Sequence, residues 1–253
     1  MAAHNNSLFQ EILANPHDDD VRLVYSDWLE EQGETERAEF IRLQIQWVNA
    51  LPRDRRRPQW LPRITELKEK FSEEWRPPEL TGVLWGDFQR GWVDSLTPTH
   101  WEAFVSQAER IFSLTPVVKI DLCFNLNGSA GAQTVAKSPW LRQLNSLNMN
   151  YNRIGDGGAV DVAFSPHLEN LFELSLNGNL IGSEGAKDLA LSPQLDNLAE
   201  LRLFDNLIGD TGAMSLVESR HLQNLELLDL RANPISKPAR EMLHKRYGNR
   251  VLV

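Results

Sequence analysis

A motif that recurs every 27 residues dominates the second half of this 253-residue chain. The copies read VVKIDLCFNLNGSAGA from Val117, LNSLNMNYNRIGDGGA from Leu144, LFELSLNGNLIGSEGA from Leu171, LAELRLFDNLIGDTGA from Leu198 and LELLDLRANPI from Leu225. One asparagine in each copy keeps the same phase, and these are Asn125, Asn152, Asn179, Asn206 and Asn233. A fixed period of this length indicates a solenoid, in which each unit contacts mainly its neighbours.

Each copy joins a strand pattern to a helix pattern. The alternation in Leu174-Ser175-Leu176 has the period of a strand and places both leucines on the inner face. Small and apolar residues follow at helical spacing, with Asp156, Ser183 and Asp210 as predicted N-caps. Ser-Pro dipeptides then end the helix, because proline cannot continue it. The sequence therefore predicts an α/β solenoid with parallel inner strands and outer helices.

The repeated asparagines interrupt the apolar rhythm where each strand ends. The backbone bends there, and a buried backbone group without a partner costs about 1–3 kcal/mol. An asparagine amide offers two donors and an acceptor, so it can satisfy such groups in its own turn and in the adjacent one. We expect the five asparagines to be structural rather than catalytic.

The frame L-x-x-L-x-L-x-x-N-x-[LI] resembles the leucine-rich repeat, and the G-[DS]-x-G-A half resembles the ribonuclease-inhibitor type. The resemblance covers about residues 117–253 and implies a ladder of stacked asparagines. Strands lie about 4.8 Å apart, whereas helices are about 10 Å across, so the strands are expected to line a concave wall. The segment 81–116 is predicted to be an atypical capping repeat. Five repeats of 27-residue phase follow from Val117, with a C-terminal cap to Val253.

Residues 1–80 have a helical rhythm instead and are predicted to form a small all-α domain. The expected helices lie before Pro16, from the Asp18 region to Gly33, from there to about Leu51, and from Ile64 to Trp75. The stretch FQEILANPHDDDVRLVYSDWLEEQGETERAEFIRLQ resembles the repeat-companion domain of bacterial proteins. That resemblance implies a position ahead of repeats and no particular activity.

Charge and composition narrow the class of partner. The net charge of −9 and the isoelectric point near 5.2 disfavour nucleic-acid binding. One cysteine excludes an internal disulfide and suggests a reducing compartment. Neither a signal peptide nor an apolar run long enough to span a membrane is seen, so we expect a cytoplasmic protein without membrane contact. Export by a route without a cleaved signal is the open alternative.

Four features that could suggest a chemical site favour simpler interpretations. The acidic run Asp18–Asp20 fits a helix start better than a metal site. The arginines of the segment 53–57 fit a solvated loop better than a phosphate site. His167 and His221 lie two periods apart, too far for one metal, and Cys123 has no predicted catalytic partner. The sequence therefore predicts no catalytic residue, no metal and no cofactor.

The outward strand positions vary while the leucines do not, as a binding surface requires. The leading hypothesis is a non-enzymatic module that binds a protein partner on the concave face, with Tyr151, Arg202, Phe204 and Arg231 as anchors. The candidate partner-binding residues are Asn148, Asn150, Tyr151, Ser175, Asn177, Arg202, Phe204, Asp205, Asp229 and Arg231.

Two alternatives remain open at this level. In the first, the protein is an enzyme or effector whose activity lies in the helical domain, around Asp27-Trp28 and Arg37-Ala38-Glu39, while the repeats choose the target. In the second, the chain is a structural component of a larger assembly. The sequence favours no oligomeric state and no particular partner.

Overall fold

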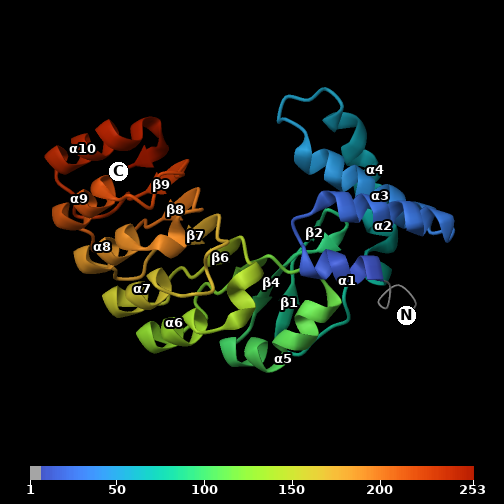
Figure 1. Ribbon diagram of the computed structural model, residues 1–253, viewed down its shortest axis with the longest axis horizontal. Coiled ribbons are helices and arrows are strands. Elements are labelled where there is room, and N and C mark those ends of the chain that lie inside the picture. Colours follow the sequence, from blue (N-terminus) through green and yellow to red (C-terminus); the bar gives the residue numbers. More distant parts are fainter. Residues whose placement is uncertain (1–6) are drawn as a thin grey trace. The chain divides into compact units, whose positions relative to one another are not determined.

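The computed structural model describes residues 7–253 and contains two compact units (Figure 1). Unit 1 comprises Met1–Leu96 and Gln107–Val118, and unit 2 comprises Thr97–Ser106 and Lys119–Val253. Strand β4 (Ser95–Pro98) and helix α5 (Trp101–Leu114) have residues in both units. The residues of each unit contact mainly other residues of the same unit.

Unit 1 begins with four helices, α1 (Ser7–Ala14), α2 (Asp19–Glu31), α3 (Thr35–Asn49) and α4 (Arg57–Trp75). Three short strands follow, β1 (Val83–Trp85), β2 (Phe88–Gln89) and β3 (Trp92–Val93). Strands β2 and β3 pair as an antiparallel hairpin, and β1 lies beside β4 in the sheet order. The unit therefore extends beyond the boundary expected near residue 80, because the hairpin packs into the same core as the helices.

Aromatic rings form much of the core of unit 1. One cluster joins α1, α2 and α3 to the hairpin through Phe9, Tyr25, Ile41 and Trp92. A second cluster packs Phe40 against α4 and the hairpin. The side chains of Arg22 and Arg37 are 2 % and 9 % exposed, so two cations lie inside this core.

One expected helix boundary in the helical region was wrong. Helix α4 begins at Arg57 and not at Ile64, because Pro58 lies in the first turn, where a missing N–H costs nothing, and Pro62 lies on an exposed side. On α2, the side chain of Val24 is 53 % exposed. The buried side of that helix carries Arg22 in addition to Tyr25 and Leu29.

Unit 2 repeats one strand and one helix. Its strands are β5 (Lys119–Asp121), β6 (Ser146–Asn148), β7 (Glu173–Ser175), β8 (Glu200–Arg202), β9 (Leu227–Asp229) and β10 (Val251–Leu252). They form parallel neighbours in chain order, and from β5 to β9 each residue pairs with the residue 27 positions later. The predicted α/β solenoid with parallel strands is confirmed.

The helices of unit 2 are α6 (Gly128–Ala136), α7 (Gly155–Ala163), α8 (Ser183–Leu191), α9 (Asp210–Glu218) and α10 (Lys237–Tyr247). They stack in chain order along one side of the strands (Figure 1). The middle residue of each strand from β5 to β9 is buried, as are the leucines that open each copy, from Leu144 to Leu225. The leucine spacing thus produces a core that continues from one repeat to the next.

Four of the asparagines join consecutive repeats through buried hydrogen bonds. The Asn206 Oδ1 accepts from the backbone N–H groups of Asn179 and Ile181, each at 3.0 Å. Its Nδ2 donates to the backbone oxygens of Leu176 and Leu203, each at 3.0 Å. Equivalent bonds involve Asn152, Asn179 and Asn233, which are 0–5 % exposed.

Asn125 differs from the other four asparagines. It is only half-buried, and its Oδ1 has no hydrogen-bond partner among the described residues, although its Nδ2 donates to the Pro98 oxygen at 2.5 Å. The Oδ1 atoms of Asn179 and Asn206 accept from the residue 27 positions earlier, whereas those of Asn152 and Asn233 accept from residues 26 and 25 positions earlier. Pro98 lies 27 positions before Asn125, and proline has no N–H. The bond of 27-residue span that Asn179 and Asn206 make therefore cannot form at Asn125.

The predicted N-caps were wrong, because these side chains serve the adjacent repeat. Ser183 and Asp210 are the first residues of their helices, and Asp156 is the second residue of α7. The Asp156 Oδ1 accepts from the backbone N–H groups of Gly182 and Gly185 at 2.6 and 3.0 Å. Asp210 accepts likewise from Ser236. Stacking brings each helix start beside the next, so the free N–H groups find a carboxylate one repeat away.

Candidate functional site

The exposed side of the unit 2 strands brings one predicted column together. Asn148, Ser175, Arg202 and Asp229 are register partners in β6, β7, β8 and β9. The first three are partly exposed, whereas Asp229 is buried at 5 % exposure. The strand spacing therefore creates a row of polar groups across four repeats, as the alternation predicts.

The next predicted column is engaged mainly within the protein. The Asn150 Oδ1 accepts from the Ser175 Oγ at 2.8 Å and from the Asn177 N–H at 2.7 Å. The Asn177 Oδ1 accepts from the Phe204 N–H at 2.8 Å. Their acceptor oxygens thus support the backbone of the following repeat. They have less capacity left for a partner than the sequence suggested.

The two arginines of this face are paired with acids two residues earlier. The Arg231 Nε and Nη2 donate to the Asp229 Oδ1 and Oδ2 at 2.9 and 2.6 Å, and Arg202 pairs with Glu200. Burial would raise the pKa of Asp229, but the hydrogen bonds from Arg231 outweigh it and hold this pKa below its ordinary value. The face therefore presents compensated charges rather than free cations. The Arg231 guanidinium also lies 5.8 Å from the centre of the Phe204 ring.

Exposed apolar side chains follow the ends of the strands in four successive repeats. Phe124, Tyr151, Leu180 and Leu207 are 76, 39, 53 and 58 % exposed, and we call them the apolar edge. The rings of Phe124 and Tyr151 stack, with centres 5.0 Å apart and planes 9° from parallel. A hollow of about 590 Å³ lies beside the two rings and is also lined by Asn127 and Arg153.

Three members of the apolar edge occupy strained backbone positions. Phe124, Tyr151 and Leu180 have φ of 56, 57 and 60°, in the left-handed region. That conformation costs a residue with a Cβ about 1–2 kcal/mol. Gly178 has the same position as Tyr151 in the next repeat, with φ of 64°, so the turn itself requires no aromatic residue. Asp205 and Ala232 have the same left-handed φ at this position in the last two repeats, so the turn imposes this conformation whatever the side chain.

The absence of a side chain at Gly178 makes room for the Tyr151 ring. A Cβ at Gly178 would lie 2.2 Å from the Tyr151 Cδ1, so the ring covers this glycine directly. The stacked pair thus rests on the bare backbone of the following repeat. This contact orients the Tyr151 ring, which leaves less conformational entropy to lose on binding a partner.

Of the predicted binding residues, Tyr151 belongs to the apolar edge, and Asp205 is exposed at the same repeat position. Sequence reasoning missed Phe124, Leu180 and Leu207 as site residues. A signal for Phe124 existed, since it shares the repeat position of Tyr151. The two leucines gave no usable signal, because leucines of a solenoid motif normally lie in its core.

Other chemistry within residues 7–253 would need metal ligands, a reactive thiol or a free acidic cluster. No cluster of three or more His, Cys, Asp or Glu side chains in that range is placed to hold a metal ion. Burial, followed by the nearby Asp121, raises the pKa of the Cys123 thiol, which disfavours the reactive thiolate. The Asp18 carboxylate caps α2 by accepting from the Asp20 N–H at 2.9 Å.

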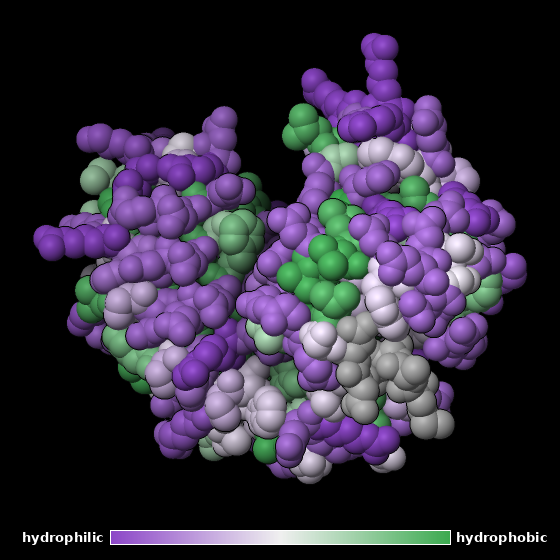
Figure 2. Space-filling model, turned by 45° about the vertical axis from the view of Figure 1, so that its right-hand side comes forward, coloured by the Kyte–Doolittle hydropathy of each residue, from purple (hydrophilic) through white to green (hydrophobic). Residues whose placement is uncertain are grey.

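The surface is mostly hydrophilic on the face seen in Figure 2, where hydrophobic residues gather in separate patches. None of the helices in the described range has the length and apolar character needed to cross a membrane. The features of unit 2 that point to recognition are thus a polar strand face and an exposed apolar edge.

Comparison with known proteins agrees with this architecture. The family described as Leucine Rich repeat matches residues 141–163, 167–190 and 196–217. No curated protein matches the chain significantly. Residues 141–217 therefore consist of leucine-rich repeats, within an α/β solenoid that a helical region precedes in the chain.

Proposed function

We propose that unit 2 is a non-enzymatic module that binds a protein partner through the apolar edge and the adjoining strand face. Leucine-rich repeats generally mediate protein–protein interaction. The observation that carries the proposal is the exposed Phe124–Tyr151 stack on left-handed backbone. Large apolar side chains gathered at an exposed position commonly mark a binding site, whereas the left-handed φ is shared by all five repeats and belongs to the turn.

The chemistry of this surface favours a particular division of roles. Aromatic residues are over-represented among the side chains that dominate binding energy, so Phe124 and Tyr151 are the proposed anchors. Leu180 and Leu207 extend the apolar contact, while the paired Arg202 and Arg231 form a polar rim. Because these cations are already compensated, we expect binding to depend only weakly on salt concentration.

The proposal is tested with three proteins used side by side as bait in extract of the source cells. The wild type is compared with the double variant Phe124→Ala/Tyr151→Ala and with Phe164→Ala. Phe164 is a matched aromatic control, because it is 47 % exposed but follows helix α7 instead of a strand. Captured proteins are quantified by mass spectrometry, and circular dichroism checks that each bait is folded.

A partner retained by Phe164→Ala and depleted at least tenfold by the double variant would support recognition through the apolar edge. Equal capture by all three baits would contradict it. Arg202→Glu serves as an additional bait for the strand face, and loss of the partner with that variant alone would move the contact there. An exposed apolar anchor is commonly worth about 2 kcal/mol or more, which corresponds to roughly a thirtyfold change in affinity.

A further inference from the structure

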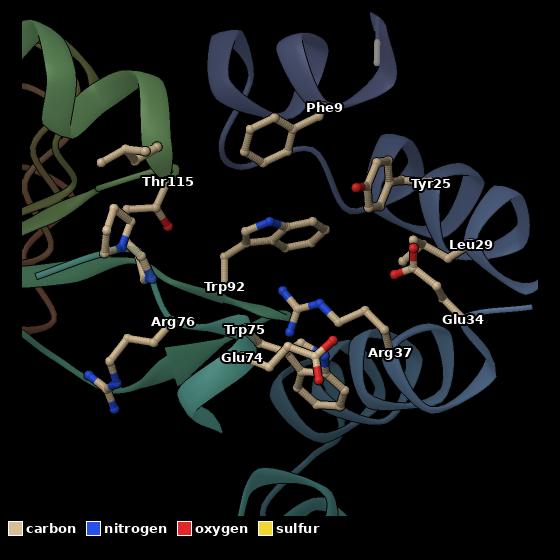
Figure 3. A pocket seen from close by; sticks show the side chains of 13 residues that line it. Phe9, Tyr25, Leu29, Glu34, Arg37, Glu74, Trp75, Arg76, Trp92 and Thr115 are labelled. Carbon is tan, nitrogen blue, oxygen red and sulfur yellow. The ribbon is translucent and has the colours of Figure 1, made fainter. Parts of the chain in front are cut away.

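A cavity of about 410 Å³ lies within unit 1 and is lined only by residues of that unit (Figure 3). Small-molecule sites commonly enclose roughly 300–1,000 Å³ and have apolar walls with a few polar groups. The walls here include the rings of Phe9, Tyr25, Trp75 and Trp92. The charged side chains that line it are Glu34, Arg37, Glu74 and Arg76.

Arg37 is the polar group that defines the cavity. Its guanidinium extends between Trp92 and Trp75 in Figure 3, with its central carbon 5.4 and 4.7 Å from the two ring centres. The Nη2 donates to the Gly91 backbone oxygen at 2.5 Å. The Nη1 is buried and has no hydrogen-bond partner among the described residues.

A buried guanidinium normally has an anionic partner, because a lone charge removed from water is costly. Burial lowers the pKa of Arg37 to about 10, so the side chain still carries its charge at neutral pH. Glu34 and Glu74 line the cavity but are themselves exposed, and neither forms an ion pair with Arg37. Arg37 thus has an unused donor and no ion-pair partner, although the carboxylates of Glu34 and Glu74 are close enough to raise its pKa.

We propose that this cavity binds a small monocarboxylate that carries an aromatic ring. The carboxylate would accept from the Arg37 Nη1, since a guanidinium donor and a carboxylate form strong charge-assisted bonds. The ring would pack among Tyr25, Trp75 and Trp92, which offer flat apolar surfaces. Arg76, whose Nη1 donates to the Gly86 oxygen at 2.9 Å, adds a second positive group at the wall.

The charged groups of the wall favour a monoanion. Arg37 and Arg76 attract a negative charge, whereas the carboxylates of Glu34 and Glu74 would repel a phosphate dianion more strongly than a monocarboxylate. The same chemistry is available from a free aromatic acid or from the C-terminus of a peptide that ends in an aromatic residue. This inference concerns unit 1 and is independent of the role proposed for unit 2.

The test is a ligand titration of the full chain, with tryptophan fluorescence as the signal. This signal reports mainly on unit 1, because six of the eight tryptophans belong to it. The ligands are phenylacetate, its neutral analogue phenylacetamide, and inorganic phosphate. We expect saturable binding of phenylacetate, at least tenfold weaker binding of phenylacetamide, and no competition by phosphate. Phenylacetamide that binds as tightly as phenylacetate would overturn the proposal, as would an absence of phenylacetate binding at millimolar concentration.

Variants separate the role of Arg37 in binding from its role in folding. Arg37→Gln should abolish the preference for the acid over the amide. If that variant fails to fold, Glu74→Gln provides the decisive measurement, because removing an exposed acid from the wall should tighten phenylacetate binding about two- to fivefold. Arg55→Gln, at an exposed arginine outside the cavity, is the control and should change nothing. Unchanged affinity in Glu74→Gln would count against an anion in the cavity.

Peptides distinguish the two sources of the ligand. Acetyl-Gly-Gly-Phe is titrated with a free and with an amidated C-terminus. Tighter binding of the free peptide than of phenylacetate would assign the cavity to a chain terminus. Tighter binding of phenylacetate would assign it to a free acid. Both results support a carboxylate site, and equal binding of the free and amidated peptides contradicts a chain-terminus site.

Discussion

At the scale of single residues, repeated polar side chains connect the units of the solenoid. The asparagines after each strand are one such series, and buried serines form another. Ser165, Ser192 and Ser219 donate to the backbone oxygens of Ala136, Ala163 and Ala190, each near the end of the preceding repeat's helix. Each series satisfies backbone groups that a turn or helix end leaves unpaired. Polar residues at fixed spacing therefore stabilise the stack between its leucine layers.

The position of an asparagine in this ladder should determine how much stability it supplies. Asn206→Ala leaves the N–H groups of Asn179 and Ile181 without a partner, so we expect a loss of about 3 kcal/mol or more in the free energy of unfolding. Asn125→Ala removes one hydrogen bond at the end of the ladder and should cost about 1 kcal/mol. Urea unfolding of both variants measures the difference. Equal losses would show that the ladder is not the source of the stability.

At the scale of elements, one side of helix α3 is shaped to receive the β2–β3 hairpin. Arg37 and Gln44 both bond to the Gly91 backbone, the first at its oxygen and the second at its N–H. Ile41 lies between them on the helix, at the spacing that keeps three residues on one face. A Cβ at Gly91 would lie 2.5 Å from the Ile41 Cγ1. Arg37, Ile41 and Gln44 thus receive a hairpin glycine that lies 47 to 54 residues later in the chain.

Gly91→Ala should weaken this contact more than an ordinary glycine substitution. Gly91 has φ of 94°, so alanine adds a left-handed penalty to the clash with Ile41, and we expect a loss of about 2–5 kcal/mol in the free energy of unfolding. Gly33→Ala is the matched control, because Gly33 has φ of 85° but no atom within 4 Å of an added Cβ. It should cost only about 1–2 kcal/mol. Near-ultraviolet circular dichroism and urea unfolding compare the two, and a similar loss in both would exclude the packing contribution.

At the scale of the whole molecule, acidic residues outnumber basic residues, and the fold lowers the pKa of some of the carboxylates. Asp210 accepts hydrogen bonds from the side chain and backbone of Ser236, and these lower its pKa. The pKa of Asp229 is also lowered, because the bonds from Arg231 outweigh the effect of burial. A lowered folded pKa means that the stabilisation is complete above the ordinary aspartate pKa of about 3.9 and is lost as the pH falls through the folded value.

Stability should therefore decrease on acidification from pH 5 toward pH 3. The melting temperature, followed by circular dichroism at 0.15 M salt, should fall across this range in the wild type. The double variant Asp210→Asn/Asp229→Asn should be less stable at pH 7 and should lose less on acidification, because two of the titrating groups are gone. Parallel curves for the two proteins would assign the acid sensitivity to other carboxylates.

Much of the architecture follows from local pattern, and so does a minor part of the candidate site. The leucines and asparagines recur at one period, and this repetition predicts both the strand register and the ladder. The position of Tyr151 on the exposed side follows in the same way. The pairing of Arg231 with Asp229 was also predictable, because residues two apart on a strand share one face. The exposure of Leu180 and Leu207 was not, since their leucine identity matches the core pattern.

The repeat period by itself determined the solenoid, because neighbouring repeats make the same contacts and each contact is set by a spacing of about 27 residues. The absence of the 27-residue bond at Asn125 can likewise be explained from the sequence once the register is known, because Pro98 has no N–H. Only the tertiary structure decided that Arg37 lies buried beside Trp75 and Trp92 with an unused donor. Those contacts join residues 38 and 55 positions apart, and no periodicity in the sequence relates them. The solenoid is thus encoded by repetition, whereas the cavity arises from long-range packing that no local pattern specifies.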